Sequence, residues 1–208
     1  MIFKKIDLFG LLIFLFHFIG MLGLSSDNLS SIFLDLVPLN LLLTFLYCYK
    51  FSPLNRHYKI CGFIFTFGFL VEVIGVKTGL LFGEYSYGYP LGLKFLNVPL
   101  IIGINWLILA ICSHGLISYF ITYFFPKVSL TSIFMVLIDI LIEPVAINLG
   151  FWSWDLIDIP VKNYFMWFIV SFIINYALAS SQIKINPRMS TYVIISQLVF
   201  FTYLNFAL

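Results

Sequence analysis

Residues 130–149 read LTSIFMVLIDILIEPVAINL, and this stretch decides the fold. It has the length of a helix that crosses a lipid bilayer, which takes about 20 mostly apolar residues. It nevertheless contains two acidic residues, Asp139 and Glu143, and a third acid, Glu72, lies in a similar apolar stretch. A carboxylate inside a bilayer is costly, so acids in such segments predict a functional site.

The rest of the chain is equally apolar. Hydrophobic residues make up 62% of it and charged residues only 10%, which excludes an ordinary soluble domain. We predict an all-α, polytopic membrane helix bundle that forms a single integral membrane domain over residues 1–208. The seven apolar spans that we predict are Leu8–Leu24, Ile32–Tyr49, Tyr58–Val76, Val98–Phe125, Leu130–Leu149, Tyr164–Ser181 and Thr191–Leu208.

The distribution of basic residues predicts how the bundle is oriented. With seven spans, one side of the membrane receives the N-terminus and the loops after the second, fourth and sixth spans. That side holds eight of the 11 basic residues, namely Lys4, Lys5, Lys50, Arg56, Lys59, Lys127, Lys184 and Arg188. Cytoplasmic loops carry an excess of Lys and Arg. We therefore expect a multi-pass protein of the cell membrane with a cytoplasmic N-terminus.

Several classes of function receive no support from the composition. A net charge of +2 gives no reason to expect a nucleic-acid partner. The three cysteines show no C-x-x-C spacing, and the three histidines are scattered, so we expect no metal site. Membrane lipid is the expected surrounding of most of the chain.

The two acids at positions 139 and 143 lie four residues apart, so they share one face of a helix. Pro144 follows directly, and it leaves the carbonyl of Ile140 without its usual helical donor. In the third span, Glu72 shares a face with small residues that allow close approach by a neighbour. We therefore expect Glu72 to point into the bundle, and we expect Asp139 and Glu143 to share protons or to face a third group. Apolar surroundings favour the neutral form of a carboxylic acid, which can then donate a proton.

Aromatic residues accompany these acids. The connections at residues 77–97 and 150–163 mix aromatics with glycine and proline, and Asn105 and Trp106 lie early in the fourth span. Interfacial belts of Tyr and Trp account for some of this pattern. Aromatic faces also attract cations, by about 0.5–2 kcal/mol each. An acid surrounded by aromatics inside a membrane therefore suggests protonation of a double bond in a lipid-soluble polyene. The candidate binding residues are Tyr85, Tyr87, Asn105, Trp106, Trp152 and Trp154.

Two long motifs resemble a known family. The first is Glu72-x-x-Gly75-x-x-Thr78-Gly79-x-x-Phe82-Gly83-x-Tyr85-x-Tyr87. The second is Asp139-x-x-x-Glu143-Pro144-x-Ala146-x-x-x-Gly150-x-Trp152-x-Trp154, followed by Ile159-Pro160-x-x-Asn163 and Trp167. Together these motifs resemble the CruF-type carotenoid 1,2-hydratases, a family of membrane carotenoid biosynthesis proteins.

This resemblance implies a hydratase that works without a cofactor. Its substrate would be a carotenoid, either lycopene-like or a bacterioruberin precursor, and water would add across the terminal C1=C2 double bond. We expect Asp139 and Glu143 to form the acid/base pair, with Glu72 holding the shared proton and the water. Asn163 joins the expected substrate-binding residues through the second motif. Association with other carotenoid enzymes would fit such a role.

Three alternatives remain open at this level. A membrane lycopene cyclase would also protonate the polyene, but an internal double bond would then capture the cation. The Tyr-rich first motif favours the hydratase over the cyclase. A small proton-coupled transporter would account for intramembrane acids. A non-catalytic pigment-binding or assembly protein would account for the glycines and aromatics, but not for three buried acids.

Overall fold

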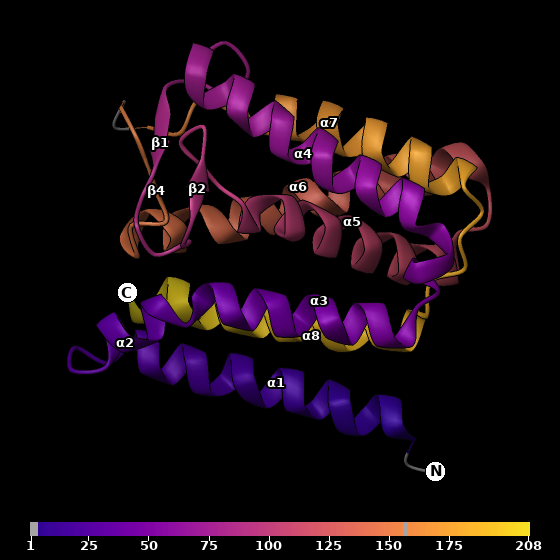
Figure 1. The fold of residues 1–208 in the computed structure, drawn as a ribbon, viewed down its shortest axis with the longest axis horizontal. Coiled ribbons are helices and arrows are strands. Elements are labelled where there is room, and N and C mark those ends of the chain that lie inside the picture. Colours follow the sequence, from indigo (N-terminus) through magenta and orange to yellow (C-terminus); the bar gives the residue numbers. More distant parts are fainter. Residues whose placement is uncertain (1–3, 156–157) are drawn as a thin grey trace.

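The computed structural model describes residues 4–155 and 158–208, and it is almost entirely helical (Figure 1). The helices are α1 (Lys5–Leu24), α2 (Ser30–Asp35), α3 (Val37–Phe51), α4 (Tyr58–Thr78), α5 (Ile101–Phe120), α6 (Phe124–Asn148), α7 (Val161–Ser180) and α8 (Pro187–Ala207). A short 3₁₀ helix, η1 (Leu54–His57), leads directly into α4. The strands are β1 (Tyr85–Tyr87), β2 (Lys94–Phe95), β3 (Val98–Pro99) and β4 (Trp152–Trp154).

The long helices run along the longest axis of the molecule in stacked layers (Figure 1). α1 forms one outer layer, α3 and α8 lie next to it, α5 and α6 follow, and α4 with α7 form the opposite outer layer. α5 is the most buried of the long helices, because it contacts α3, α4, α6, α7 and α8. Within the described residues, six helices are long and apolar enough to cross a membrane, which confirms the predicted all-α polytopic bundle.

The second predicted span differs from the structure. Residues Ile32–Tyr49 do not form one helix but belong to the short α2 and the 15-residue α3, which falls short of the length of the other spans. Pro38 explains the break. It lies in the first turn of α3, where its missing N–H costs nothing, but it cannot continue a helix that arrives from α2.

The fourth predicted span was too long at both ends. Val98 and Pro99 form β3, which pairs with β2, and α5 begins only at Ile101. At the other end α5 stops at Phe120, and Phe124 already belongs to α6. α6 then continues through Pro144 to Asn148.

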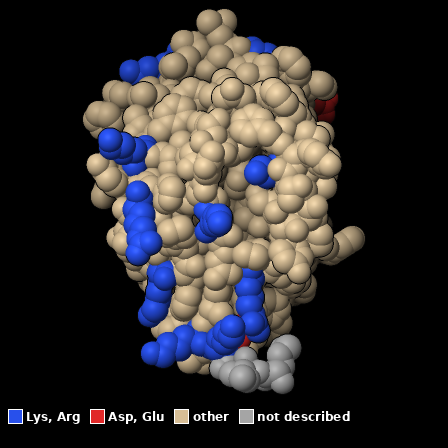
Figure 2. All heavy atoms as spheres, turned by 90° about the vertical axis from the view of Figure 1, so that its right-hand side faces the viewer, with Lys and Arg blue, Asp and Glu red and all other residues tan. Residues whose placement is uncertain are grey.

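The two ends of the bundle differ in charge. The N-terminus and the connections α3–α4, α5–α6 and α7–α8 lie at one end, on the right in Figure 1. Lys and Arg side chains gather on this face, with few acidic ones in view (Figure 2). All four strands lie at the opposite end. The structure thus places most of the basic residues at one end, as the loop count predicted.

A small ribbon at the less basic end joins the two aromatic connections. β1 and β4 pair antiparallel, with Tyr85 opposite Trp154 and Tyr87 opposite Trp152. The backbones come very close just beyond this ribbon, where the N–H of Gly88 donates to the carbonyl of Phe151 at 2.8 Å. A side chain at Gly88 would collide with the carbonyl of Gly150. Two segments far apart in sequence are thereby held against each other.

Candidate active site

Glu72 lies at the centre of a buried hydrogen-bond cluster near the ribbon. It is located in the last third of α4 and is only 4% exposed. Its Oε2 accepts from the hydroxyls of Tyr85 at 2.5 Å and Tyr87 at 2.8 Å, and its Oε1 accepts from the indole N–H of Trp106 at 3.0 Å. Three neutral donors from β1 and α5 therefore satisfy this carboxyl group, an arrangement that suits an ionised carboxylate.

Two glycines on α4 leave room for these donors. A Cβ at Gly68 would lie 2.7 Å from the ring of Trp106, and one at Gly75 would lie 2.9 Å from the hydroxyl oxygen of Tyr85. Gly68 and Gly75 flank Glu72, one turn before it and one turn after it. The small residues on this helix face thus admit aromatic side chains that bind the acid.

Glu143 has a matching set of donors from the other strand. Its Oε1 accepts from the indole N–H groups of Trp152 at 2.7 Å and Trp154 at 2.6 Å. Its Oε2 has no hydrogen-bond partner among the described residues. Because β4 alternates its side chains, Trp152 and Trp154 both turn to the same face of the ribbon. The spacing of two in the sequence is what allows both indoles to reach one carboxyl group.

The rings of β1 and β4 pack against each other across the ribbon on this face, one pair tilted and the other edge to face. The ring centres of Tyr85 and Trp154 lie 5.1 Å apart, and those of Tyr87 and Trp152 lie 6.1 Å apart. Burial and the nearby carboxyl group of Glu72 raise the pKa of both Tyr85 and Tyr87 above the ordinary value. Both tyrosines therefore remain protonated and able to donate.

A small pocket of about 30 Å³ lies between these groups, large enough for one or two water molecules but not for a bulky ligand. Two acids, Glu72 and Glu143, face it, and none of its lining residues in the described part of the chain is basic. Its other lining residues are Phe82, Tyr85, Tyr87, Ile102, Asn105, Trp106, Trp152, Trp154, Asn163 and Trp167. The structure thus brings together nine of the ten residues that the sequence singled out.

Asp139 is the tenth of these residues, and it does not line the pocket. It lies on α6 one turn before Glu143 and is 1% exposed. Its Oδ2 is buried without a hydrogen-bond partner among the described residues. Asn163 is equally buried at the start of α7, and its side-chain amide nitrogen also has no such partner.

Two further aromatic residues line the pocket, and the sequence analysis had not selected them as site residues. Trp167 stacks on Trp106 with ring centres 4.0 Å apart, and Phe82 packs against Tyr85. The signal for Trp167 was present in the sequence, because it follows Asn163 by four residues and so shares its helix face. The signal for Phe82 was its place in the first motif.

This geometry combines proton donors with rings that stabilise positive charge. Neither Glu72 nor Glu143 has a cationic partner in the described structure, so each can exist as a neutral acid or as a carboxylate without breaking an ion pair. Several aromatic faces surround the same small space, and each can attract a cation. The pocket is thus suited to proton transfer through a short-lived cation.

Comparison with known proteins gives a family. A family model described as "Carotenoid biosynthesis protein" matches residues 31–208. A protein of Haloarcula japonica named bisanhydrobacterioruberin hydratase is 26% identical over 110 residues, which cover 47% of this chain and 36% of that protein. The chain thus matches just over a third of that relative's length. No solved structure matches. Since the family model covers most of its length, the chain belongs to the carotenoid biosynthesis protein family.

Proposed function

We propose that the chain is a carotenoid hydratase, which adds water across the terminal C1=C2 double bond of an acyclic carotenoid end group. The observation that carries the proposal is the pocket that two buried carboxyl groups line, each held by its own aromatic donors, with no basic residue among the described residues of its lining. The family supplies the class of substrate, and the name of the Haloarcula japonica relative supplies the type of reaction.

The first step is protonation of the double bond. Glu143 is the proposed proton donor, because its Oε1 is held by two indoles while its Oε2 is left without a partner and can carry the proton. The proton adds to C2, and the electron pair of the double bond forms the new C–H bond. A tertiary cation remains at C1, at the edge of the pocket, and the ring of Trp152 is suited to stabilise it.

The second step is capture of the cation by water. The lone pair of a water oxygen forms a bond to C1, and the oxygen then loses a proton to the carboxylate of Glu72, which yields a tertiary alcohol; the proton must then return to Glu143. Glu72 is suited to hold this water in the pocket, because its three donors fix the orientation of its carboxyl group. Asp139, buried one turn from Glu143, forms the proposed acid/base pair with it and returns the proton. No cofactor enters either step.

We further propose that the basic end of the bundle faces the cytoplasm in the cell membrane, which follows from the positive-inside rule. The pocket then lies toward the outer half of the bilayer. The substrate would arrive within the membrane, as the product of an enzyme that lengthens or desaturates carotenoids.

The test is expression in a lycopene-producing bacterium, followed by chromatography and mass spectrometry of the extracted pigments. We expect a pigment heavier by one water for each modified end, with the chromophore unchanged. A pigment of unchanged mass with a shorter chromophore would instead show a cyclase, and unaltered lycopene would contradict hydration of this substrate.

Variants of the acids connect the activity to the pocket. We expect Asp139→Asn to abolish the hydrated product while the protein remains in the membrane. Glu84→Gln is the matched control, since Glu84 is exposed in the same connection as β1 and does not line the pocket. Full activity of Asp139→Asn would overturn its place in the acid/base pair.

A further inference from the structure

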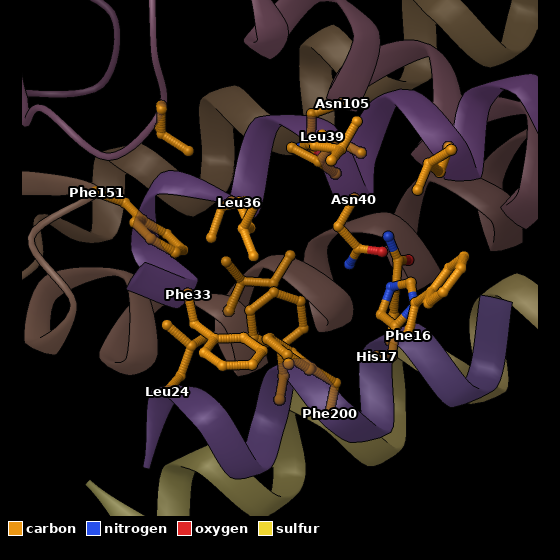
Figure 3. Close-up of a pocket in the computed structure, with 18 of the residues that line it drawn as sticks. Phe16, His17, Leu24, Phe33, Leu36, Leu39, Asn40, Asn105, Phe151 and Phe200 are labelled. Atoms are coloured by element: carbon orange, nitrogen blue, oxygen red, sulfur yellow. The ribbon is translucent and has the colours of Figure 1, made fainter. Parts of the chain in front are cut away.

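A second and much larger cavity of about 390 Å³ lies beside the acid pocket. α1, α2, α3, α5, α6 and α8 all contribute to its wall, which is made mostly of Phe, Leu and Ile side chains. Figure 3 shows this wall, with Leu24 and Phe33 on one side and Leu36 and Phe200 nearby. A cavity of this size is typical of a site for a small organic ligand.

The two cavities share part of their walls. Ile102, Asn105 and Trp152 line both of them. Trp152 is also one of the two indoles that donate to Glu143. A ligand in the large cavity can therefore contact Trp152, whose indole donates to the proposed proton donor, whereas the acid pocket alone has room only for water.

The large cavity also reaches the surface of the bundle. Phe16 and Ile19 of α1 and Leu39 of α3 line it, and each of them is at least 41% exposed. These side chains lie on apolar helices, so the surface that they expose faces lipid. An apolar molecule in the membrane can enter here without passing through water.

We propose that this cavity is the subsite for the polyene chain of the substrate, and that α1 closes it. One end of the carotenoid lies in the cavity with its terminal double bond against Trp152, on the side of the acid pocket, and the rest of the chain extends between α1 and α3 into the bilayer. This inference rests on the proposed function, because the wall that the cavity shares with the acid pocket indicates the occupant. The family match begins at residue 31, so the wall that α1 contributes lies outside the matched region.

Gly20 of α1 offers a direct test. It lines the cavity, and a Cβ at this position meets only the ring of Phe200 at 3.6 Å, an ordinary contact. Gly20→Leu therefore leaves the helix in place while its side chain fills the cavity. Gly62→Leu on α4 is the matched control, since a Cβ there meets nothing within 4 Å and the residue is not in the wall.

The experiment measures two quantities in a lycopene-producing bacterium: the pigment that copurifies with the tagged protein, and the hydrated pigment in the cells. We expect Gly20→Leu to lower both by about tenfold or more, because the leucine side chain takes up space that the polyene would occupy. Gly62→Leu should match the unchanged protein in both. Equal pigment binding and hydration in the two variants would overturn the proposal.

A second pair of variants, both on α3, tests the same proposal without any change in α1. Leu39→Trp places a bulky ring at the mouth of the cavity, and Leu46→Trp places the same ring two turns later on the exposed face of α3, outside the wall. We expect only Leu39→Trp to reduce bound and hydrated pigment. Normal hydration in both Leu39→Trp and Gly20→Leu would refute the subsite but leave the hydratase standing. Pigment that binds to the unchanged protein, is lost in Gly20→Leu and is never hydrated would refute the hydratase alone.

Discussion

Buried acids occur at both ends of this bundle, and they are paired in opposite ways. At the basic end, Asp7 is 1% exposed, and its Oδ1 lies 2.6 Å from Nε of Arg188, so α1 and α8 are joined by an ion pair. At the other end, Glu72 and Glu143 are nearly as buried, but among the described residues they accept only from tyrosine hydroxyls and indole N–H groups. An acid with a cationic partner is fixed in its ionised form, whereas an acid held by neutral donors is free to gain and lose a proton. The ion pair at the first end suits a structural role, whereas the neutral donors at the second end fit the proposed proton transfer.

The largest expected effect separates the two ends by activity. Glu143→Gln keeps an oxygen for the indoles of Trp152 and Trp154 but removes the proton, so we expect hydrated pigment to fall by about 100-fold or more. Asp7→Asn removes the charge that faces Arg188, at the far end from the pocket, and should retain most of the activity. Pigment analysis of cells with matched protein levels measures both. Equal losses in the two variants would break the comparison.

The next effect concerns stability, for which we expect the variant at Asp7 to lose more than the variant at Glu143. We expect Asp7→Leu to destabilise the protein by about 1–2 kcal/mol, less than for a fully buried ion pair because Arg188 is 38% exposed and can be hydrated. Glu143→Gln should change stability less, since its indole partners keep an acceptor. Thermal unfolding in detergent measures the difference, with the loss of soluble protein on heating as the signal. A larger fall in melting temperature for Glu143→Gln would show that its cluster is structural.

These two ends also differ in how far the sequence predicted them. Glu72 and Glu143 were identified because an acid in an apolar span is conspicuous in any sequence. Asp7 was not, since it lies beside Lys4 and Lys5 near the start of the first span, where a charge is ordinary. Helical periodicity shows which residues share a face, but not which distant helix will face them. The contact between Asp7 and Arg188 therefore required the structure.

The same limit applies to the ribbon and the large cavity. The sequence indicated that Tyr85, Tyr87, Trp152 and Trp154 belong together near the acids, from their spacing and their motif. It could not give the register that sets Tyr85 opposite Trp154, because a pairing between two three-residue strands leaves no periodic signal. The large cavity is formed by helices that are adjacent only in the folded bundle, so no local pattern predicted it.

A smaller effect concerns the donors to Glu72. Tyr87→Phe removes one of the three hydrogen bonds to this carboxyl group, and we expect a several-fold loss of hydration. The pKa of Tyr87 is raised in the folded protein, so its contribution to stability is fully present below about pH 10, the ordinary tyrosine value, and is lost as the pH rises further. The thermal stability of the unchanged protein should therefore show no loss from this tyrosine between pH 7 and pH 10. A fall in the thermal stability of the unchanged protein between pH 7 and pH 10 that is absent in Tyr87→Phe would show that Tyr87 loses its proton in this range. It would contradict the view that Tyr87 is a protonated donor.

The smallest effect tests which face of the ribbon matters. Ser86 and Ser153 pair between the aromatic positions, and their hydroxyls lie 3.4 Å apart on the exposed face, away from the pocket. Ser86→Ala keeps the backbone pairing and should change stability by less than about 0.5 kcal/mol and leave hydration unchanged. Tyr87→Phe also keeps the backbone, but it alters the face that contacts Glu72. If Ser86→Ala reduced hydration as much as Tyr87→Phe, the ribbon would act as a whole, and the distinction between its aromatic and its exposed face would fail.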